Sequence, residues 1–150
     1  MIVDSHAHLV PPELIAAIRS ERARFPGVRV GRLCSGHVTR YANAKIVAPM
    51  GAAGLPFVLG RLRRNAEITP GVADPVEAIG RLYVDTILHD ARVLQFVIAM
   101  LGTERLMMGS DSPFPIGDLE PMKIVAAAGL SADQAAVVNG GLAKKVFGIK

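Results

Sequence analysis

The sequence predicts an α/β fold built on a parallel sheet, and three observations lead to this prediction. Short apolar runs at residues 2–6, 44–49, 81–88 and 105–111 are typical of buried strands, and stretches with helical spacing follow them. No tandem repeat of fixed period occurs, and no linker divides the 150 residues. Alternation of strand and helix is typical of parallel strands joined by right-handed crossovers. We therefore expect a single domain, 1–150, with about four parallel strands and flanking helices.

The first predicted strand, residues 2–6, leads into a helix and then a loop. The segment "PPELIAAIRSERARF" opens with proline and carries Leu14, Ile15 and Ile18 at helical spacing. Closely spaced glycines and the lack of a periodic pattern predict a loop from Pro26 to Gly36.

Each of the next two predicted strands precedes a helix. The strand "AKIVAP" at 44–49 is followed by the small-residue turn "MGAAG" and by the helical stretch "LPFVLGRLRRNAEI". The strand at 81–88 is followed by "HDARVLQFVIAMLG", in which Gly102 is the expected C-cap. After the strand at 105–111, Ser131 and Gln134 predict a capping box at the start of a helix in the tail.

Composition and charge limit the classes of protein to which the chain can belong. Hydrophobic residues make up 51% of the sequence, which argues against disorder, and the apolar runs are too short to span a bilayer. Lysine and arginine outnumber aspartate and glutamate by 17 to 13, but aromatic residues are 5% and no nucleic-acid-binding motif is present. We expect the charge to attract a small acidic substrate, with no nucleic-acid or membrane partner.

Two features predict a cytoplasmic location. The opening "MIVDSHAH" lacks the basic-then-apolar pattern of a secretory signal. Cys34 is the single cysteine, so an internal disulfide cannot form, and a reducing compartment fits the sequence.

Three polar residues alternate at the end of the first predicted strand. Asp4, His6 and His8 share one face of an extended chain, because alternate side chains of a strand point the same way. Two neutral imidazoles beside a carboxylate match the ligands that zinc and its first-row neighbours prefer. The alternative is a pair of histidines at a strand end that bond to backbone and water.

Asp111 ends the fourth predicted strand, in "MGSDSPFP", where two prolines follow it. The carboxyl ends of parallel strands carry the chemistry of α/β enzymes, so Asp111 stands where a metal ligand or a general base is useful. The alternative is an aspartate that caps the next turn through its own backbone.

Four stretches together resemble the metal-dependent amidohydrolase superfamily, and the nearest branch is the group similar to aminocarboxymuconate-semialdehyde decarboxylase. These stretches are "VDSHAHLVPPE", "KIVAPMGAAGLPFVLGRL", "LYVDTILHD" and "GTERLMMGSDSPFPIGD". The resemblance covers most of residues 1–30 and then 38–150. The pairing of Asp-x-His-x-His with Gly-Ser-Asp-x-Pro-Phe-Pro makes it specific.

The resemblance implies a partial (β/α) barrel of the TIM type and a metal site built from its strand ends. His6, His8 and Asp111 would ligate a divalent metal, zinc or else manganese or iron, and Asp111 would also handle a proton or hold water at the metal. The implied reaction is hydrolysis or non-oxidative decarboxylation of a small carboxylated substrate. Arg61 matches the arginine that binds the substrate carboxylate in the decarboxylase branch, in places from a neighbouring subunit; its alternative is a solvated helix arginine.

The chain also departs from the family pattern. A TIM-type barrel usually takes about 250 residues, whereas this chain has 150, and the stretch without a counterpart falls near Val30 to His37. A histidine normally carried by the fifth strand is therefore absent. Met50 stands where the family has a histidine, and Leu142 where it has an asparagine. A thioether moves no protons and is a poor ligand for hard metals.

Three interpretations of function therefore remain open. The chain is a metal-dependent hydrolase or carboxy-lyase, or a catalytically inactive half-barrel remnant of one that associates with itself without turnover, or a basic binding module. His37 and His89 are possible replacement ligands, but we expect both in surface or capping roles. The runs "KIVAP" and "MIVDSH" would be unpaired sheet edges of a half-barrel, so we expect a homo-oligomer.

Overall fold

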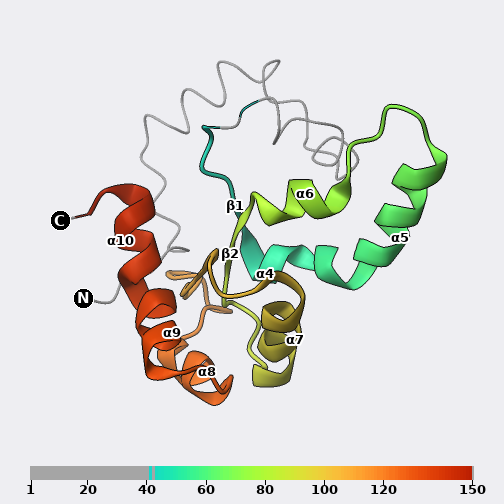
Figure 1. Ribbon diagram of the computed structural model, residues 1–150. Coiled ribbons are helices and arrows are strands. Elements are labelled where there is room, and N and C mark those ends of the chain that lie inside the picture. The colour runs from blue at the N-terminus through green and yellow to red at the C-terminus, as the bar shows by residue number, and fades with distance from the viewer. Residues whose placement is uncertain (1–40, 42, 150) are drawn as a thin grey trace.

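The computed structural model describes residues 41 and 43–149, which form a small parallel sheet surrounded by helices (Figure 1). The elements follow one another in the order β1 (Val47–Ala48), α4 (Pro49–Ala53), α5 (Leu55–Ile68), α6 (Pro75–Gly80), β2 (Tyr83–Asp85), α7 (Ala91–Leu101), β3 (Leu106–Met107), α8 (Pro121–Ala127), α9 (Ala132–Ala136), the π-type turn η2 (Val137–Gly141) and α10 (Leu142–Phe147). The first predicted strand, 2–6, the helix after it and the loop from Pro26 to Gly36 lie outside the described residues.

The three described strands are parallel and neighbour one another in the order β1-β2-β3, as the alternation of strand and helix predicted. Val47 pairs with Tyr83, and Asp85 pairs with Met107. Each strand is shorter than the apolar run that predicted it, because only two or three residues of each run pair with a neighbouring strand. In Figure 1, α5 and α6 lie toward the β1 side of the sheet, and α8, α9 and α10 lie toward the opposite side.

The two faces of the sheet differ in chemistry. Val84 and Leu106 lie side by side in the ladder and belong to the main cluster of buried apolar residues. Their chain neighbours Asp85 and Met107 also pair, so they lie on the opposite face, since successive side chains of a strand alternate. Both are fully buried and neither belongs to that cluster. One face therefore packs on the helices, and the other carries a buried carboxylate.

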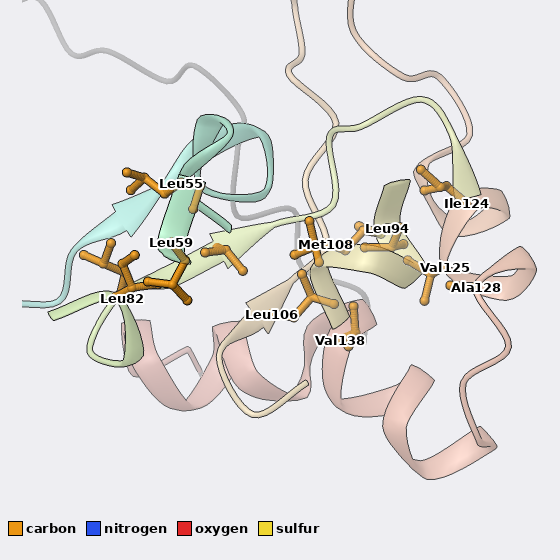
Figure 2. Packing of buried hydrophobic residues seen from close by; sticks show 14 residues of the cluster. Leu55, Leu59, Leu82, Leu94, Leu106, Met108, Ile124, Val125, Ala128 and Val138 are labelled. Atoms are coloured by element: carbon orange, nitrogen blue, oxygen red, sulfur yellow. The ribbon is translucent and has the colours of Figure 1, made fainter. Parts of the chain in front are cut away.

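The main core runs along the helix-covered face of the sheet (Figure 2). Leu59 of α5 and Leu82 lie at one end of this cluster, Leu94 of α7 and Leu106 lie in its middle, and Val125 of α8 lies at the other end. Full burial of a leucine or valine side chain contributes roughly 1.5–3 kcal/mol of transfer free energy. The cluster therefore holds the helices against the strands whose ends carry the candidate site.

Several predicted helix signals are confirmed. α5 has the predicted bounds, Gly102 is the C-cap of α7 as predicted, and Ser131 and Gln134 form the predicted capping box. α6 was not predicted; Pro75 begins it, and the Asp74 carboxylate caps it by accepting the Val76 N–H. None of the helices in the described part of the chain combines the length and the apolar character needed to cross a lipid bilayer.

Candidate active site

The chain after β3 forms a closed loop at the carboxyl end of the sheet. The Ser110 carbonyl accepts the Asp118 N–H at 2.7 Å, and the Ser110 hydroxyl accepts the Ser112 N–H at 3.1 Å. The Asp111 carbonyl accepts the Phe114 N–H at 3.0 Å. Because both ends of the loop return to residues 110 and 111, the backbone that carries the Asp111 carboxylate is held in one place.

Gly117 packs closely against the start of this loop. A Cβ atom at this position would lie 2.8 Å from the Ser110 carbonyl oxygen and 3.0 Å from that of Asp111. Both oxygens belong to the backbone and cannot move aside easily. Any side chain at position 117 would therefore push the loop away from the strand end. Asp111 itself is half-buried and has a left-handed backbone, with φ of 60°.

Two buried polar residues at the end of β2 connect the three strand ends. The Asp85 side chain is fully buried, and one of its carboxylate oxygens accepts the Ile87 N–H at 3.2 Å and the Gly51 N–H at 3.4 Å. The Thr86 hydroxyl accepts the Gly109 N–H at 3.3 Å. Asp85 thus joins β2 to the turn after β1, and Thr86 joins β2 to the chain after β3.

The turn after β1 has an unusual backbone. Met50, Ala52 and Ala53 have φ of 52°, 70° and 49°, and Gly51 and Gly54 have φ of 57° and 82°. Left-handed backbone costs roughly 1–2 kcal/mol for a residue with a Cβ, so three such residues in one turn store strain. The small-residue turn that "MGAAG" predicted is confirmed, and α4 is a left-handed turn rather than a regular helix.

An apolar hollow of about 510 Å³ opens beside this turn, between the starts of α5 and α7. Met50, Phe57 and Phe96 line it, and Met50 is 52% exposed. Asp90 and Arg92 form an ion pair of 2.7 Å at its rim. The side-chain hydrogen bond from Arg92 lowers the pKa of Asp90 to about 2.

The described residues include three of the side chains that the sequence analysis singled out beyond the first strand. Asp111 was predicted to end a strand at 105–111; β3 ends at Met107, and Asp111 lies in the loop that follows it, on the carboxyl side of the sheet. Arg61 is exposed on α5 and does not line the apolar hollow. His89 is exposed and precedes α7, but the residue that caps this helix is Asp90, whose carboxylate accepts the Arg92 N–H at 2.8 Å.

The predicted ligands His6 and His8 lie outside the described residues, as do Asp4 and His37. Among residues 41 and 43–149, no group of three or more histidine, cysteine, aspartate or glutamate side chains is arranged to hold a metal ion. Of the predicted ligand set, Asp111 alone lies among the described residues. Two imidazoles and one carboxylate are ligands that suit a first-row divalent cation. The spatial arrangement of these three side chains stays a prediction.

Asp85 is the polar residue of this region that the sequence analysis did not single out. Its signal is visible in "LYVDTIL", where one acidic residue interrupts an otherwise apolar strand. Aspartate is almost never fully buried without partners. An acidic residue inside a predicted buried strand therefore indicates a structural or functional role.

Known proteins that resemble the chain in sequence are decarboxylases. The chain is 30% identical over 96 residues to the 2-amino-3-carboxymuconate-6-semialdehyde decarboxylase of Dictyostelium discoideum, a match that covers 60% of this chain and 27% of that protein. The match thus spans only about a quarter of the length of that relative. No protein-family profile matches the chain.

Solved structures agree in fold. The structure of 5-carboxyvanillate decarboxylase from Sphingomonas paucimobilis superposes with a TM-score of 0.67 and 26% identity, over 88% of this chain and 40% of that one. A dihydroxybenzoic acid decarboxylase from Polaromonas, solved with bound manganese, has a TM-score of 0.65 and 20% identity over 96% of this chain and 48% of its own. Together with the motifs at the strand ends, these similarities confirm the resemblance to the metal-dependent amidohydrolase superfamily.

Proposed function

We propose that the chain contributes to a metal-dependent decarboxylase site at the carboxyl ends of its strands. The observation that carries this proposal is the position of Asp111 in the loop after β3, next to the buried Ser110 and close in sequence to Gly109, whose N–H the Thr86 hydroxyl accepts. Relatives at 30% and 26% identity are decarboxylases, which favours carbon–carbon lyase chemistry over hydrolysis.

The proposed metal ligands are His6, His8 and Asp111. Zinc fits two imidazoles and a carboxylate, and manganese or iron fits them as well; the manganese in the Polaromonas decarboxylase supports the second choice. A divalent cation at this position would polarise a substrate oxygen and stabilise the negative charge that develops as carbon dioxide leaves. The closed loop around Gly117 would keep the Asp111 carboxylate in a fixed position for this task.

The proposed substrate is a small carboxylated molecule. In non-oxidative decarboxylation the bond from carbon to the carboxylate breaks, its electron pair stays on that carbon, and a proton takes the place of carbon dioxide. Asp111 is the proposed carrier of this proton, because a carboxyl group at a strand end can act as a general acid or base. Arg61, exposed on α5, is the proposed partner of the substrate carboxylate, in the same subunit or in a neighbouring one.

The architecture proposed for the whole chain is a partial (β/α) barrel in a single truncated domain. The three parallel strands and the buried Asp85 on the face away from the main core support it, because the inner face of a barrel accommodates residues that a helix-covered face does not. β1 has β2 as its one strand neighbour among the described residues, so its free edge supports the proposed homo-oligomer.

The second candidate is a catalytically inactive remnant that folds and associates without turnover. Met50 favours it, because this thioether occupies the exposed rim position where the resemblance places a proton-transferring histidine. The two candidates share the metal site and differ in turnover.

Two measurements on the purified full chain test the proposal. Metal analysis is expected to give about one divalent ion per chain, and His6→Ala and Asp111→Ala are each expected to lower this content at least tenfold. Asp118→Asn, which changes a nearby carboxylate outside the ligand set, is the matched control and should keep the ion. Release of carbon dioxide from a panel of hydroxybenzoates and muconate derivatives would support the decarboxylase, whereas metal retention without any turnover would support the remnant. Metal content unchanged in both ligand variants would contradict the site.

A further inference from the structure

A second hollow, of about 320 Å³, lies at the amino ends of the strands, at the opposite end of the sheet from Asp111. We call it the cationic hollow and define it by its lining residues, which are Lys45, Tyr83, Glu104, Arg105, Leu142, Lys145 and Val146. Lys45 precedes β1, Tyr83 begins β2, Arg105 precedes β3, and α10 supplies one wall. The hollow is therefore built by four separate segments of the chain.

The charges around the cationic hollow are unbalanced. Lys45, Arg105 and Lys145 line it against one acid, Glu104. One oxygen of the Glu104 carboxylate lies close to the position that a Cβ of Gly102 would occupy. In the described part of the chain neither lysine forms an ion pair with a carboxylate, although four other basic side chains do. Three like charges around one hollow repel one another, and an anion would remove this repulsion.

Arg105 is held in place by interactions that leave it able to bind an anion. Its guanidinium carbon lies 5.0 Å from the centroid of the Tyr83 ring, and its Nη1 donates to the Arg81 carbonyl at 3.1 Å. Guanidinium has five N–H donors, and stacking over a ring uses none of them. A half-buried, oriented arginine loses little conformational entropy when it binds an anion, unlike a flexible surface side chain.

We propose that the cationic hollow binds a small polyanion, of the phosphate or the di- and tricarboxylate class. Arg105 supplies the fixed, bidentate donor, and Lys45 and Lys145 neutralise the remaining charge. The volume suits a ligand of this size, since small-molecule pockets begin at about 300 Å³. The site is separate from the proposed decarboxylase site, so neither its existence nor its failure depends on that function.

Isothermal titration calorimetry of the full chain with inorganic phosphate, and separately with citrate, tests the proposal at a constant ionic strength set by sodium chloride. Binding of either anion at one site per chain is expected, and the tighter one identifies the class. Lys145→Gln is expected to weaken binding about tenfold, which corresponds to about 1.4 kcal/mol, because it removes one charge-assisted hydrogen bond to the anion.

Lys144→Gln is the matched control, because it removes the same charge from the neighbouring position of α10 and Lys144 does not line the hollow. It should change the affinity less than twofold, and Lys145→Arg should restore most of it. Circular dichroism of each variant checks that the fold is retained. The proposal is overturned if neither phosphate nor citrate binds in excess of chloride, or if the two glutamine variants lose affinity equally.

Discussion

The turn after β1 and the loop after β3 occupy corresponding places at the carboxyl end of the sheet, yet different interactions hold them. The loop after β3 is closed by short backbone hydrogen bonds to Ser110 and Asp111. The turn from Met50 to Gly54 is a run of left-handed residues, and the Asp85 carboxylate connects it to β2 through a longer bond of 3.4 Å. The loop after β3 thus contains one left-handed residue, Asp111, whereas the turn after β1 consists of five in a row.

This difference coincides with how far each region keeps the family pattern. The loop after β3 contains Gly-Ser-Asp-x-Pro-Phe-Pro unchanged, and it presents Asp111. The turn after β1 has Met50 where the family has a histidine. Strain at a turn is retained when surrounding structure over-determines it, and such strain often marks a functional site. The turn is thus strained, and Met50 lacks the proton-transferring group that the resemblance leads us to expect there.

Removal of the Asp85 carboxylate, which connects the turn after β1 to β2, should cause the largest loss of stability. Asp85→Ala leaves the N–H groups of Gly51 and Ile87 without this acceptor, and each unsatisfied buried donor costs about 1–3 kcal/mol. We expect the free energy of unfolding to fall by about 3 kcal/mol or more. Chemical denaturation measures this loss. The matched control is Asp118→Ala, which removes an exposed cap on the Glu120 N–H and should cost about 1 kcal/mol or less. Equal losses would refute the role given to Asp85.

Addition of a Cβ at Gly117, in the loop after β3, should cause the next largest loss of stability. Gly117→Ala places a methyl group 2.8 Å from the Ser110 carbonyl oxygen, and overpacking of this kind typically costs about 1–3 kcal/mol. Gly60→Ala is the control, because this glycine lies in the interior of α5 with open space around it and should gain about 0.5–1 kcal/mol. Thermal unfolding of both variants gives the comparison. Stabilisation by both alanines would mean that the loop is not closely packed.

Relief of backbone strain in the turn after β1 should have a smaller effect, and it should stabilise the protein. Ala53 is exposed with φ of 49°, so Ala53→Gly removes left-handed strain without loss of buried area, and we expect a gain of about 0.5–1 kcal/mol. Ala126→Gly in α8 is the control; this exposed alanine has regular helical surroundings, and its replacement should cost about 1 kcal/mol. Urea titrations measure the two changes. A loss of stability in both variants would show that the turn carries no strain.

The smallest expected effect concerns the cap of α7 at the rim of the apolar hollow. The pKa of Asp90 is lowered to about 2 by its hydrogen bonds with Arg92, from 3.8 in the unfolded chain. A lowered folded-state pKa stabilises the protein above pH 4, and this contribution disappears as the pH falls from 4 toward 2. Asp90→Asn keeps a good cap and removes the charge. The difference in melting temperature between the variant and the parent should therefore shrink as the pH falls from 4 and vanish below pH 2. A difference that stays constant over this range would rule out the ionised cap as its source.

Much of the helical framework could be predicted because its signals are local. α5 begins after Gly54 and carries proline in its first turn, and the Ser131–Gln134 capping box depends on residues three apart. The parallel order of the strands followed from the alternation of strand and helix.

The parts of the site that were not predicted depend on contacts between distant segments. The burial of Asp85 depends on Gly51, 34 residues away, so the acidic residue in its strand gave no indication of its partner. The "MGAAG" sequence predicted a turn but not its handedness, because alanine is rarely left-handed without outside constraint. His6 and His8 lie outside the described residues, so their predicted meeting with Asp111 stays a prediction.

A crystal structure of the full chain grown with zinc, with anomalous scattering recorded at the zinc edge, tests the central claim most directly. We predict one strong peak at the carboxyl ends of the strands, about 2.0–2.2 Å from the Asp111 carboxylate and from the imidazoles of His6 and His8. A peak bound elsewhere, or the two imidazoles at the other end of the sheet from Asp111, would contradict the proposed site.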